Sequence, residues 1–412
     1  MSSAVPEGWG VYQLSSLLEL HHGYQFRTPD FSETGIKVVK IGQVIGQGHL
    51  DLSDCDFVSE ELAKEKKDFL LMSGDILMSL TGNIGRVGVV PVTDVPLIQN
   101  YRVGKFVPNL DKINQTFLPH ILGSPMVTNQ LETNSNSTAQ ANFGKADIDK
   151  IIVDIPPLPE QKKIASILTS VDEVIENTQK QIDKLQDLKK ATMNELLTKG
   201  IGHTEFKDSE LGRIPASWEV LLLDSVTQRG SGHTPSKQEL SYWNGGIKWV
   251  SLADTFRLDN GLIYETDKEI SDEGLANSSA VLHPAGTVVL SRDAGVGKSA
   301  VLNEEMAVSQ HFIGWRCDER MDSWFLYYLL QLLKPVFENI AVGSTIKTIG
   351  LDFFKKLKIT YPPRVEQKDI SERLKSFDEH LRSLKSKLNK TKSLKKSLMQ
   401  DLLTGKVRVM VN

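Results

Sequence analysis

The stretch of this sequence closest to a known chemical motif is RDAGVGKSA at residues 292–300, which ends in Gly-Lys-Ser like a phosphate-binding loop. In such a loop the backbone N–H groups of the glycines surround the phosphates and the lysine neutralises them. The motif requires a glycine five residues before the glycine of the Gly-Lys pair, and Arg292 occupies that position. We therefore expect a glycine-rich turn between strands that presents Lys298, and no nucleotide site.

Other catalytic or metal chemistry has little support in the residue types. The nine histidines are scattered without the spacing of metal ligands. Two cysteines, Cys55 and Cys317, are too few for a zinc site or a disulfide framework. No serine lies in the Gly-x-Ser-x-Gly motif that positions many hydrolase nucleophiles. The sequence thus predicts no catalytic residue and no metal or cofactor bound by this chain.

Polar residues in the loops of both halves of the chain have side chains of the kinds that bind DNA. Arg, Lys, Asn and Gln can hydrogen bond to base edges, while hydroxyl groups and lysines hold phosphates. The candidates in the first half are Gln25, Arg27, Thr28, Asn83, Arg86, Gln99, Asn100, Tyr101, Arg102, Gln140 and Asn142. Those at equivalent places in the second half are His233, Thr234, Lys237, Arg292, Lys298, Gln310, His311, Thr345 and Lys347. For any one of them, a solvated or turn-stabilising side chain is the alternative.

A repeated segment defines these two halves. Residues 156–163 read PPLPEQKK and residues 362–369 read PPRVEQKD, 206 residues later. At the same offset LKKATMNELLT (188–198) aligns with LKKSLMQDLLT (394–404). Prolines precede each copy and a glycine follows it, as they do at the two ends of a helix. Each copy is therefore predicted to form one long helix.

Each predicted helix has apolar residues at alternating steps of four and three, which is the pattern of a coiled-coil seam. The seam positions are Ile164, Leu168, Val171, Ile175, Ile182 and Leu185 in the first helix, and Ile370, Leu374, Phe377, Leu381, Leu384 and Leu388 in the second. We expect the two helices to pack on each other as a spacer about 60 Å long, at 1.5 Å per residue. The alternative is two unrelated amphipathic helices, each lying on its own domain.

The segments before the helices repeat more faintly. PEGW (6–9) aligns with PASW (215–218), and GIKVV (35–39) with GIKWV (246–250). SGDILMSLTGNIGRVGVV (73–90) aligns with AGTVVLSRDAGVGKSAVL (285–302), and FLPHIL (117–122) with FLYYLL (325–330). These pieces read as short strands separated by glycines. The prediction is an α+β fold with globular domains at 1–155 and 215–361, helices at 156–199 and 362–405, and a linker at 200–214.

Composition and charge agree with a water-soluble protein but leave the partner open. The 412 residues suggest two to three domains, with 40% hydrophobic and 24% charged residues. The first residues lack the pattern of a signal peptide, and the most apolar run, FLYYLLQLL (325–333), is short for a membrane span, so we expect a cytoplasmic protein. The net charge is −4, although residues 362–412 carry 13 basic and 6 acidic groups. Charge alone does not decide for or against DNA.

Three segments resemble the specificity subunits of type I restriction–modification systems: PPLPEQKKIASILTSVDEVI (156–175), TEFKDSELGRIPASW (204–218) and LKKSLMQDLLTGKVRV (394–409). The resemblance implies two target recognition domains alternating with two long helices, which pack as an antiparallel coiled coil with a pseudo-twofold repeat. It implies that each domain reads one half of a split, asymmetric DNA site and that the helices set the gap. It also implies that the chain is a non-catalytic subunit. Its partners would be two modification subunits, which carry S-adenosylmethionine, and restriction subunits, which use ATP and magnesium.

Two other functions remain open from the sequence. A tandem coiled-coil scaffold that binds only proteins would share the repeat but not the sequence-dependent DNA binding. An enzyme with a nucleotide site at Lys298 would share the Gly-Lys-Ser stretch and would lose its activity in Lys298→Ala.

Overall fold

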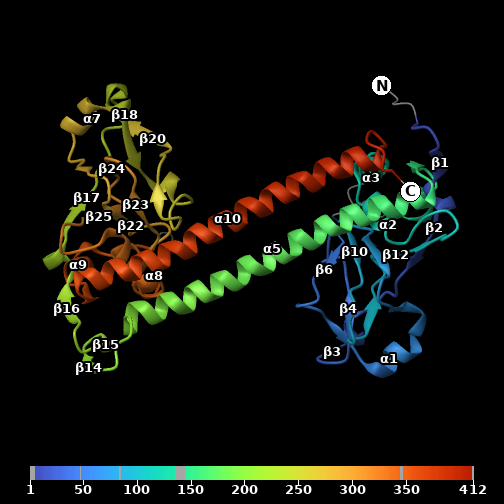
Figure 1. Ribbon diagram of the computed structural model, residues 1–412, viewed down its shortest axis with the longest axis horizontal. Coiled ribbons are helices and arrows are strands. Elements are labelled where there is room, and N and C mark those ends of the chain that lie inside the picture. Colours follow the sequence, from blue (N-terminus) through green and yellow to red (C-terminus); the bar gives the residue numbers. More distant parts are fainter. Residues whose placement is uncertain (1–4, 47, 83–84, 136–143, 344–346, 411–412) are drawn as a thin grey trace. The chain divides into compact units, whose positions relative to one another are not determined.

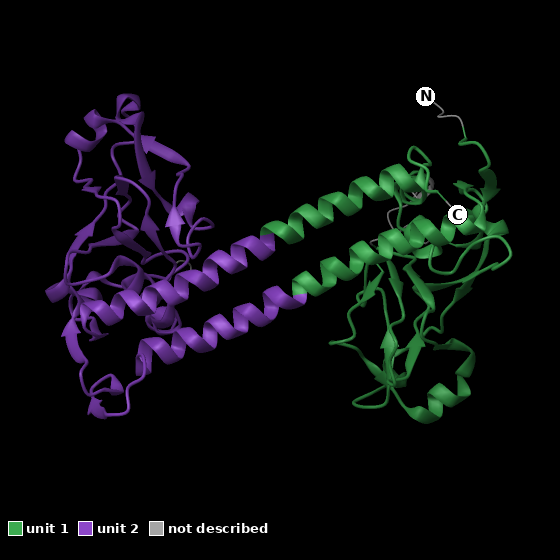
Figure 2. Ribbon diagram, in the orientation of Figure 1, with its two compact units in different colours: residues 1–179, 386–412 green, residues 180–385 purple. Residues whose placement is uncertain are grey.

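The computed structural model describes residues 5–46, 48–82, 85–135, 144–343 and 347–410. The chain forms two compact units, one made of residues 1–179 with 386–412 and the other of residues 180–385 (Figure 2). Each unit is a globular domain of strands and helices together with parts of two long helices, α5 (Leu158–Lys199) and α10 (Arg364–Leu403). The domain limits expected from the sequence, which assign the helices to segments of their own, stay predictions.

The first unit is built mainly of short strands. Its strands are β1 (Gly10–Gln13), β2 (Leu18–His22), β3 (Phe31–Ser32), β4 (Ile36–Val39), β5 (Val44–Gly46), β6 (His49–Leu50), β7 (Phe57–Val58), β8 (Leu70–Leu71), β9 (Ile76–Ser79), β10 (Val87–Val89), β11 (Leu97–Gln99), β12 (Val103–Pro108) and β13 (Ile152–Ile155). Its shorter helices are α1 (Glu60–Glu65), α2 (Leu118–Leu122), α3 (Pro125–Ser135) and α4 (Lys145–Ile148), with 3-10 helices η1 (Leu14–Ser16), η2 (Thr28–Asp30) and η3 (Lys67–Phe69).

The second unit has a matching set of elements. Its strands are β14 (Phe206–Ser209), β15 (Gly212–Pro215), β16 (Glu219–Leu222), β17 (Gln228–Ser231), β18 (Trp243–Val250), β19 (Leu262–Ile263), β20 (Lys268–Ile270), β21 (Leu282–His283), β22 (Val288–Ser291), β23 (Ser299–Leu302), β24 (Met306–Val308), β25 (Phe312–Arg316) and β26 (Lys358–Tyr361). Its shorter helices are α6 (Leu223–Val226), α7 (Asp272–Ala276), α8 (Ser323–Ile340) and α9 (Leu351–Lys355), with 3-10 helices η4 (Leu240–Tyr242) and η5 (Leu252–Asp254).

The repeat seen in the sequence extends to the strand order of the sheets. Four strands of one sheet have the order β2-β12-β9-β10 in the first unit and β17-β25-β22-β23 in the second, where β19 adds a fifth strand beside β23. Four strands of another sheet have the order β7-β4-β11-β8 in the first unit, where β3 adds a fifth strand beside β7, and β20-β18-β24-β21 in the second. The equivalent pairs β4–β11 and β18–β24 are both parallel. The end strands pair as β1-β13 and β16-β26. The α+β fold and the internal repeat expected from the sequence are therefore confirmed.

The central strands β9 and β22 are buried along their whole length, which explains why they read as continuous apolar runs. The segments FLPHIL and FLYYLL, in contrast, do not form the strands that we expected. They lie in α2 and α8, which pack against β10 and against β22 and β23 (Figure 1). Asp322 caps α8, because its carboxylate accepts the backbone N–H groups of Trp324 and Phe325. A fully apolar run without this cap fits a buried strand equally well.

The predicted seam is the buried side of both long helices. Ile164, Leu168, Ile175 and Ile182 in α5, and Ile370, Leu374, Leu381 and Leu388 in α10, are buried, whereas Val171, Leu185, Phe377 and Leu384 are half-buried. The first residues of each helix share a core with the last residues of the other. In the first unit Ile164 and Leu168 lie in one cluster with Leu402 and Leu403. In the second, Ile370 and Leu374 lie in one cluster with Leu196 and Leu197.

An ion pair joins the two helices in each unit. Asp172 of α5 pairs with Lys395 of α10 at 2.5 Å in the first unit, and Asp378 of α10 pairs with Lys189 of α5 in the second. These are equivalent positions at the offset of 206 residues. Because residue numbers that rise along α5 meet numbers that fall along α10, the two helices are antiparallel within each unit.

The repeated Glu-Gln of the two helix starts also has a structural role in each unit. Gln161 is buried; it donates to the carbonyls of Lys112 and Pro156 and accepts the N–H of Asn114. Gln367 is buried in the same way, with Arg320 and Pro362 as acceptors and the N–H of Asp322 as donor. The glutamine thus ties the start of each long helix to its globular domain.

The preceding glutamate anchors a neighbouring segment. Glu366 accepts hydrogen bonds from the N–H of Ile201, from His203 and from Trp218. Glu160 accepts hydrogen bonds from Nε and Nη2 of Arg408 at 2.8 Å, and Nη1 of Arg408 donates to the carbonyl of Glu7. The segment after each long helix is therefore held at the start of the other. Within the described residues, no helix has the length and apolarity needed to cross a membrane.

Candidate nucleic-acid interface

A tight turn joins the two main sheets in each unit and carries two polar side chains at its tip. In the first unit the N–H of Val103 donates to the carbonyl of Asn100, so Tyr101 and Arg102 form the tip between β11 and β12. In the second unit the N–H of Phe312 donates to Ser309, so Gln310 and His311 form the tip between β24 and β25. The same turn therefore presents different hydrogen-bonding groups in the two units.

A second loop packs against this turn because a glycine allows two backbones to meet. A Cβ atom at Gly23 would lie 2.4 Å from the carbonyl oxygen of Asn100, and one at Gly232 would lie 1.9 Å from that of Val308. No other residue fits at either position without moving the backbone. The residues that follow in the first unit, Gln25, Arg27 and Thr28, are exposed beside the turn.

The corresponding loop of the second unit brings three more candidates to the turn. His233 is exposed, and its N–H donates to the carbonyl of Val308. The hydroxyl of Thr234 donates to the amide oxygen of Gln310. Lys237 is exposed and extends the loop with a positive charge.

The loop between β9 and β10, and its counterpart between β22 and β23, also contacts the turn. In the first unit the N–H of Leu80 donates to the carbonyl of Arg102, and in the second the N–H of Arg292 donates to that of His311. Arg86 is exposed at the end of this loop. Its counterpart Lys298 is half-buried and donates to the carbonyl of Thr255 at 3.2 Å.

The Gly-Lys-Ser stretch is the turn between β22 and β23 that we expected. The N–H of Lys298 donates to the carbonyl of Gly295, and the strand β23 follows directly. A phosphate-binding loop leads into a helix, whose N-terminus faces the phosphates. The turn therefore lacks the structural context of a nucleotide site.

Some candidates serve the protein itself. Gln99 is 2% exposed, and its amide donates to the carbonyls of His21 and Val103, so its side chain holds β2 and β12 together. Asn100 is 6% exposed and caps the turn by accepting the N–H of Arg102. We correct the expectation for these two residues, because their polar groups are used inside the domain. Arg292 is half-buried and donates to the carbonyl of Ile349, which fastens the adjacent loop.

Lys347 is exposed on that adjacent loop, close to the backbone pairing of Asp293 with Thr348. The candidates Asn83, Gln140, Asn142 and Thr345 lie outside the described residues. Three segments that are distant in the second half of the sequence thus meet at the turn of Gln310 and His311.

The structure adds one residue to this group that the sequence did not suggest. Asp293 is 8% exposed, and its carboxylate accepts a hydrogen bond from Nδ1 of His311 at 2.6 Å. Gln310 in turn lies between His311, 3.4 Å from Nε2, and Thr234. Asp293 lies in the stretch RDAGVGKSA (292–300), and no local sequence pattern links it to a histidine 18 positions later.

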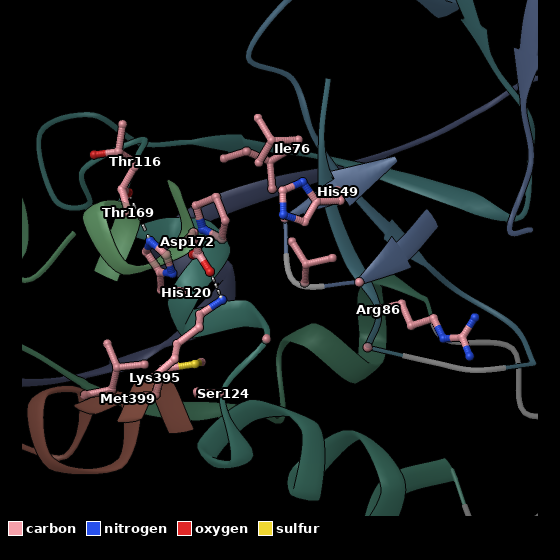
Figure 3. A pocket seen from close by; sticks show the side chains of 18 of the residues that line it. His49, Ile76, Arg86, Thr116, His120, Ser124, Thr169, Asp172, Lys395 and Met399 are labelled. Carbon is pink, nitrogen blue, oxygen red and sulfur yellow. Dashed lines mark hydrogen bonds and ion pairs between the residues drawn. The ribbon is translucent and has the colours of Figure 1, made fainter. Parts of the chain in front are cut away.

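The first unit also contains a cavity of about 1170 Å³ against α2, α5 and α10. Figure 3 shows His120 beside Thr169, and Asp172 paired with Lys395, on one side of this cavity. Burial lowers the pKa of His120 to about 4, so its imidazole is neutral at physiological pH.

The second unit carries two aromatic side chains at the positions equivalent to Pro119 and His120. In the alignment of FLPHIL with FLYYLL, Pro119 and His120 correspond to Tyr327 and Tyr328. Both tyrosines are buried, and the hydroxyl of Tyr328 donates to Asp378 at 2.7 Å. Two positions beside the cavity of the first unit thus carry smaller side chains than their counterparts in the second unit.

Neither a metal nor a nucleophile site emerges from the described residues. Among them, no group of three or more His, Cys, Asp and Glu residues could hold a metal ion. Burial raises the pKa of Cys317 to about 12, so this thiol is not an activated nucleophile. What the loops offer is a set of exposed hydrogen-bond donors and acceptors around one turn in each unit.

Comparison with known proteins identifies relatives along the whole chain. A family model described as "Type I restriction modification DNA specificity domain" matches residues 6–187 and 215–392. The type I restriction enzyme MjaVIII specificity subunit of Methanocaldococcus jannaschii is 26% identical and covers 98% of this chain and 94% of its own length. The StySPI specificity subunit of Salmonella potsdam is 21% identical, with 98% and 89% covered.

A solved structure shares the fold. The S subunit of a type I restriction–modification system from M. genitalium aligns with a TM-score of 0.60 at 14% identity, and the alignment covers 96% of each chain.

Proposed function

The chain belongs to the type I restriction–modification DNA specificity family, whose model matches both of its halves, and we propose that it is the subunit that selects the DNA sequence on which such a system acts. Each globular domain reads one half of a split, asymmetric site. The chain itself carries out no chemistry. The alternative, a scaffold that binds only proteins, has no support from the relatives.

The observation that carries this proposal is the pair of equivalent turns with different tips. Both units have the same strand order and the same three loops, yet one turn presents Tyr101 and Arg102 and the other presents Gln310 and His311. Base edges differ in their pattern of donors and acceptors, so different side chains at the same place select different bases. Two copies of one scaffold with different tips fit a site whose halves differ in sequence.

The candidate residues divide between bases and phosphates by chemistry. Arg102 and Gln310 at the tips suit base edges, because guanidinium and amide groups bond bases through two atoms at once. Arg27, Lys237 and Lys347 are exposed on the loops around the tips and suit phosphates. The remaining exposed candidates, such as Gln25 and His233, belong to the same surfaces.

The two long helices act as the spacer between the half-sites. α5 is one continuous helix of 42 residues and α10 one of 40 residues. In each unit the first residues of one helix and the last residues of the other belong to the core of the domain. A rigid element built into both domains can fix the number of base pairs between the two half-sites.

The chain works with partner subunits in the cytoplasm. Two modification subunits that use S-adenosylmethionine methylate adenine at the selected site, and restriction subunits that use ATP and magnesium cut unmethylated DNA. We assign these cofactors to the partners, since the exposed loops of this chain offer groups for DNA. The solvated faces of the long helices are available for the partner subunits.

The test uses the purified chain in complex with its modification subunits and a library of random DNA duplexes. We expect the bound DNA to share one bipartite sequence with a constant gap. Replacing residues 1–155 by the same domain of a relative should change one half-site only. Equal binding to all sequences at moderate salt would overturn the proposal, because phosphate contacts alone give that result.

The spacer is tested separately. Inserting four residues into α5 and four at the equivalent place in α10 lengthens each by about 6 Å, which corresponds to about two base-pair steps of 3.4 Å. The gap should widen by one or two base pairs while both half-sites keep their sequences. A changed half-site with an unchanged gap would contradict the spacer role.

A further inference from the structure

The tip of the turn in the second unit holds an exposed glutamine between two partners. Gln310 follows β24 in the turn from Ser309 to Phe312, and its side chain is exposed. Its amide oxygen faces the hydroxyl of Thr234, and its amide nitrogen lies 3.4 Å from Nε2 of His311. An exposed glutamine ordinarily changes its rotamer freely, so two partners on one amide are a notable restriction.

The direction of these hydrogen bonds is fixed by the residue at the inner end. The carboxylate of Asp293 can only accept, so Nδ1 of His311 carries the proton that bridges the 2.6 Å between them. In the neutral imidazole Nε2 is then an acceptor and faces the amide NH₂ of Gln310. The amide oxygen is consequently at the other end, where it accepts from Thr234. This series of hydrogen bonds therefore allows only one orientation of the Gln310 amide.

Asp293 is itself held firmly. It is 8% exposed, and its carbonyl accepts a hydrogen bond from the hydroxyl of Ser291 at 2.6 Å. Its backbone pairs with Thr348 of the neighbouring loop. Because its position is set by buried backbone contacts, it can orient a histidine that is partly exposed.

Gln310 retains unused hydrogen-bonding capacity after these contacts. An amide nitrogen has two hydrogens and an amide oxygen has two lone pairs, and one of each is taken. One donor and one acceptor therefore remain on an exposed amide group. In the major groove, adenine presents an acceptor, N7, next to a donor, N6–H₂, whereas guanine presents two acceptors.

We propose that Gln310 reads an adenine in the half-site bound by the second unit, and that Thr234, His311 and Asp293 are positioning residues that fix its amide. The inference rests on the proposed function and adds a base to it. It applies to the second half-site only, because the equivalent tip of the first unit carries Tyr101 and Arg102.

The test measures binding of the complete complex with the modification subunits to its own bipartite site. At one adenine of the second half-site, 7-deazaadenine should weaken wild-type binding about 10- to 100-fold, the range of one bidentate contact. Gln310→Ala should bind weakly and be insensitive to that substitution. Gln310→Glu should shift the preference at this position toward cytosine, because a carboxylate accepts from the cytosine amino group.

The positioning residues are tested through the tautomer of His311. Asp293→Asn no longer fixes the ring proton on Nδ1 of His311, because an amide can donate to Nδ1 as well as accept from it. The amide of Gln310 is then no longer held in one orientation. We expect Asp293→Asn to lose most of the preference for adenine over guanine while keeping the preference in the first half-site.

The outcomes separate the two proposals. A complex that binds all sequences alike refutes the proposed function. A complex that reads both half-sites, but whose second half-site is unchanged in Gln310→Glu or insensitive to 7-deazaadenine in the wild type, refutes only the role of Gln310. Retained reading of the first half-site in each variant shows that the chain is folded.

Discussion

Removing the ion pair between the long helices should lower the free energy of unfolding by different amounts in the two units. Lys395 and Asp172 have side chains that are 9% and 17% exposed, and those of Lys189 and Asp378 are 21% and 28% exposed. Removing one partner of a buried pair leaves the other charge without compensation, which costs about 3 kcal/mol or more. We expect this full cost for Lys395→Met in the first unit.

The equivalent change in the second unit should cost less because a tyrosine remains. After Lys189→Met, Asp378 still accepts the hydroxyl of Tyr328 at 2.7 Å. Burial and the neighbouring carboxylate raise the pKa of Tyr328, so it stays a neutral donor. A hydrogen bond to a charged group contributes about 1.5–3 kcal/mol. We therefore expect Lys189→Met to cost only about 1–2 kcal/mol.

The measurement is urea unfolding of each variant, with hydrogen exchange of α5 and α10 to locate the loss in one unit. Lys390→Met, at an exposed position of α10, is the matched control and should change the free energy of unfolding by less than about 0.5 kcal/mol. Adding Tyr328→Phe to Lys189→Met should raise its cost to that of Lys395→Met. Equal costs for the two single variants, or a cost of Lys189→Met that Tyr328→Phe leaves unchanged, would refute this reasoning.

Three more predictions follow from buried polar groups. Gln99→Ala should lower the free energy of unfolding by about 1–3 kcal/mol because the part-buried carbonyl of His21 and the buried carbonyl of Val103 lose their donor. Site-selection experiments should show both half-sites unchanged. Burial lowers the pKa of His283 to about 4 from an ordinary 6.5. Between these pH values the unfolded chain binds more protons than the folded chain, so the free energy of unfolding should fall by up to about 3 kcal/mol as the pH drops from 6.5 to 4. Urea unfolding should find a smaller loss in His283→Asn. His120→Tyr should raise the melting temperature by filling the cavity and by donating to Asp172, as Tyr328 does in the other unit; a lower melting temperature would show that the cavity does not accept the ring.

The repeat and the long helices could be predicted because their signals are local. Heptad spacing, the prolines before each helix and the glycines after it lie in one continuous segment, and the buried roles of Gln161 and Gln367 explain why this part of the repeat stays similar. Even so, the seam is not uniform: the half-buried Val171 and Phe377 fit the spacing as well as their fully buried neighbours.

The site residues were harder to predict because their partners are distant. Gln99 looks like an exposed loop residue, and the carbonyl that it bonds belongs to His21, 78 positions earlier. Asp293 was missed since its partner His311 is brought close by the strand order. The helix α8 was mistaken for a strand because its run is apolar all round, although Asp322 just before it is a helix-capping residue whose signal was present.

The first unit is assembled from both ends of the chain, and this has a consequence for biosynthesis. Residues 180–385, which separate its two pieces, form the second unit. At a translation rate of about 5–20 residues per second, these 206 residues take about 10 to 40 s to make. Until then, Glu160 lacks Arg408, and the core around Ile164 lacks Leu402 and Leu403. The half of the protein that leaves the ribosome first is therefore the half that completes its folding last. A chain truncated before Leu402 should be degraded by proteases because its first unit is incomplete, even though its second unit has all of its residues.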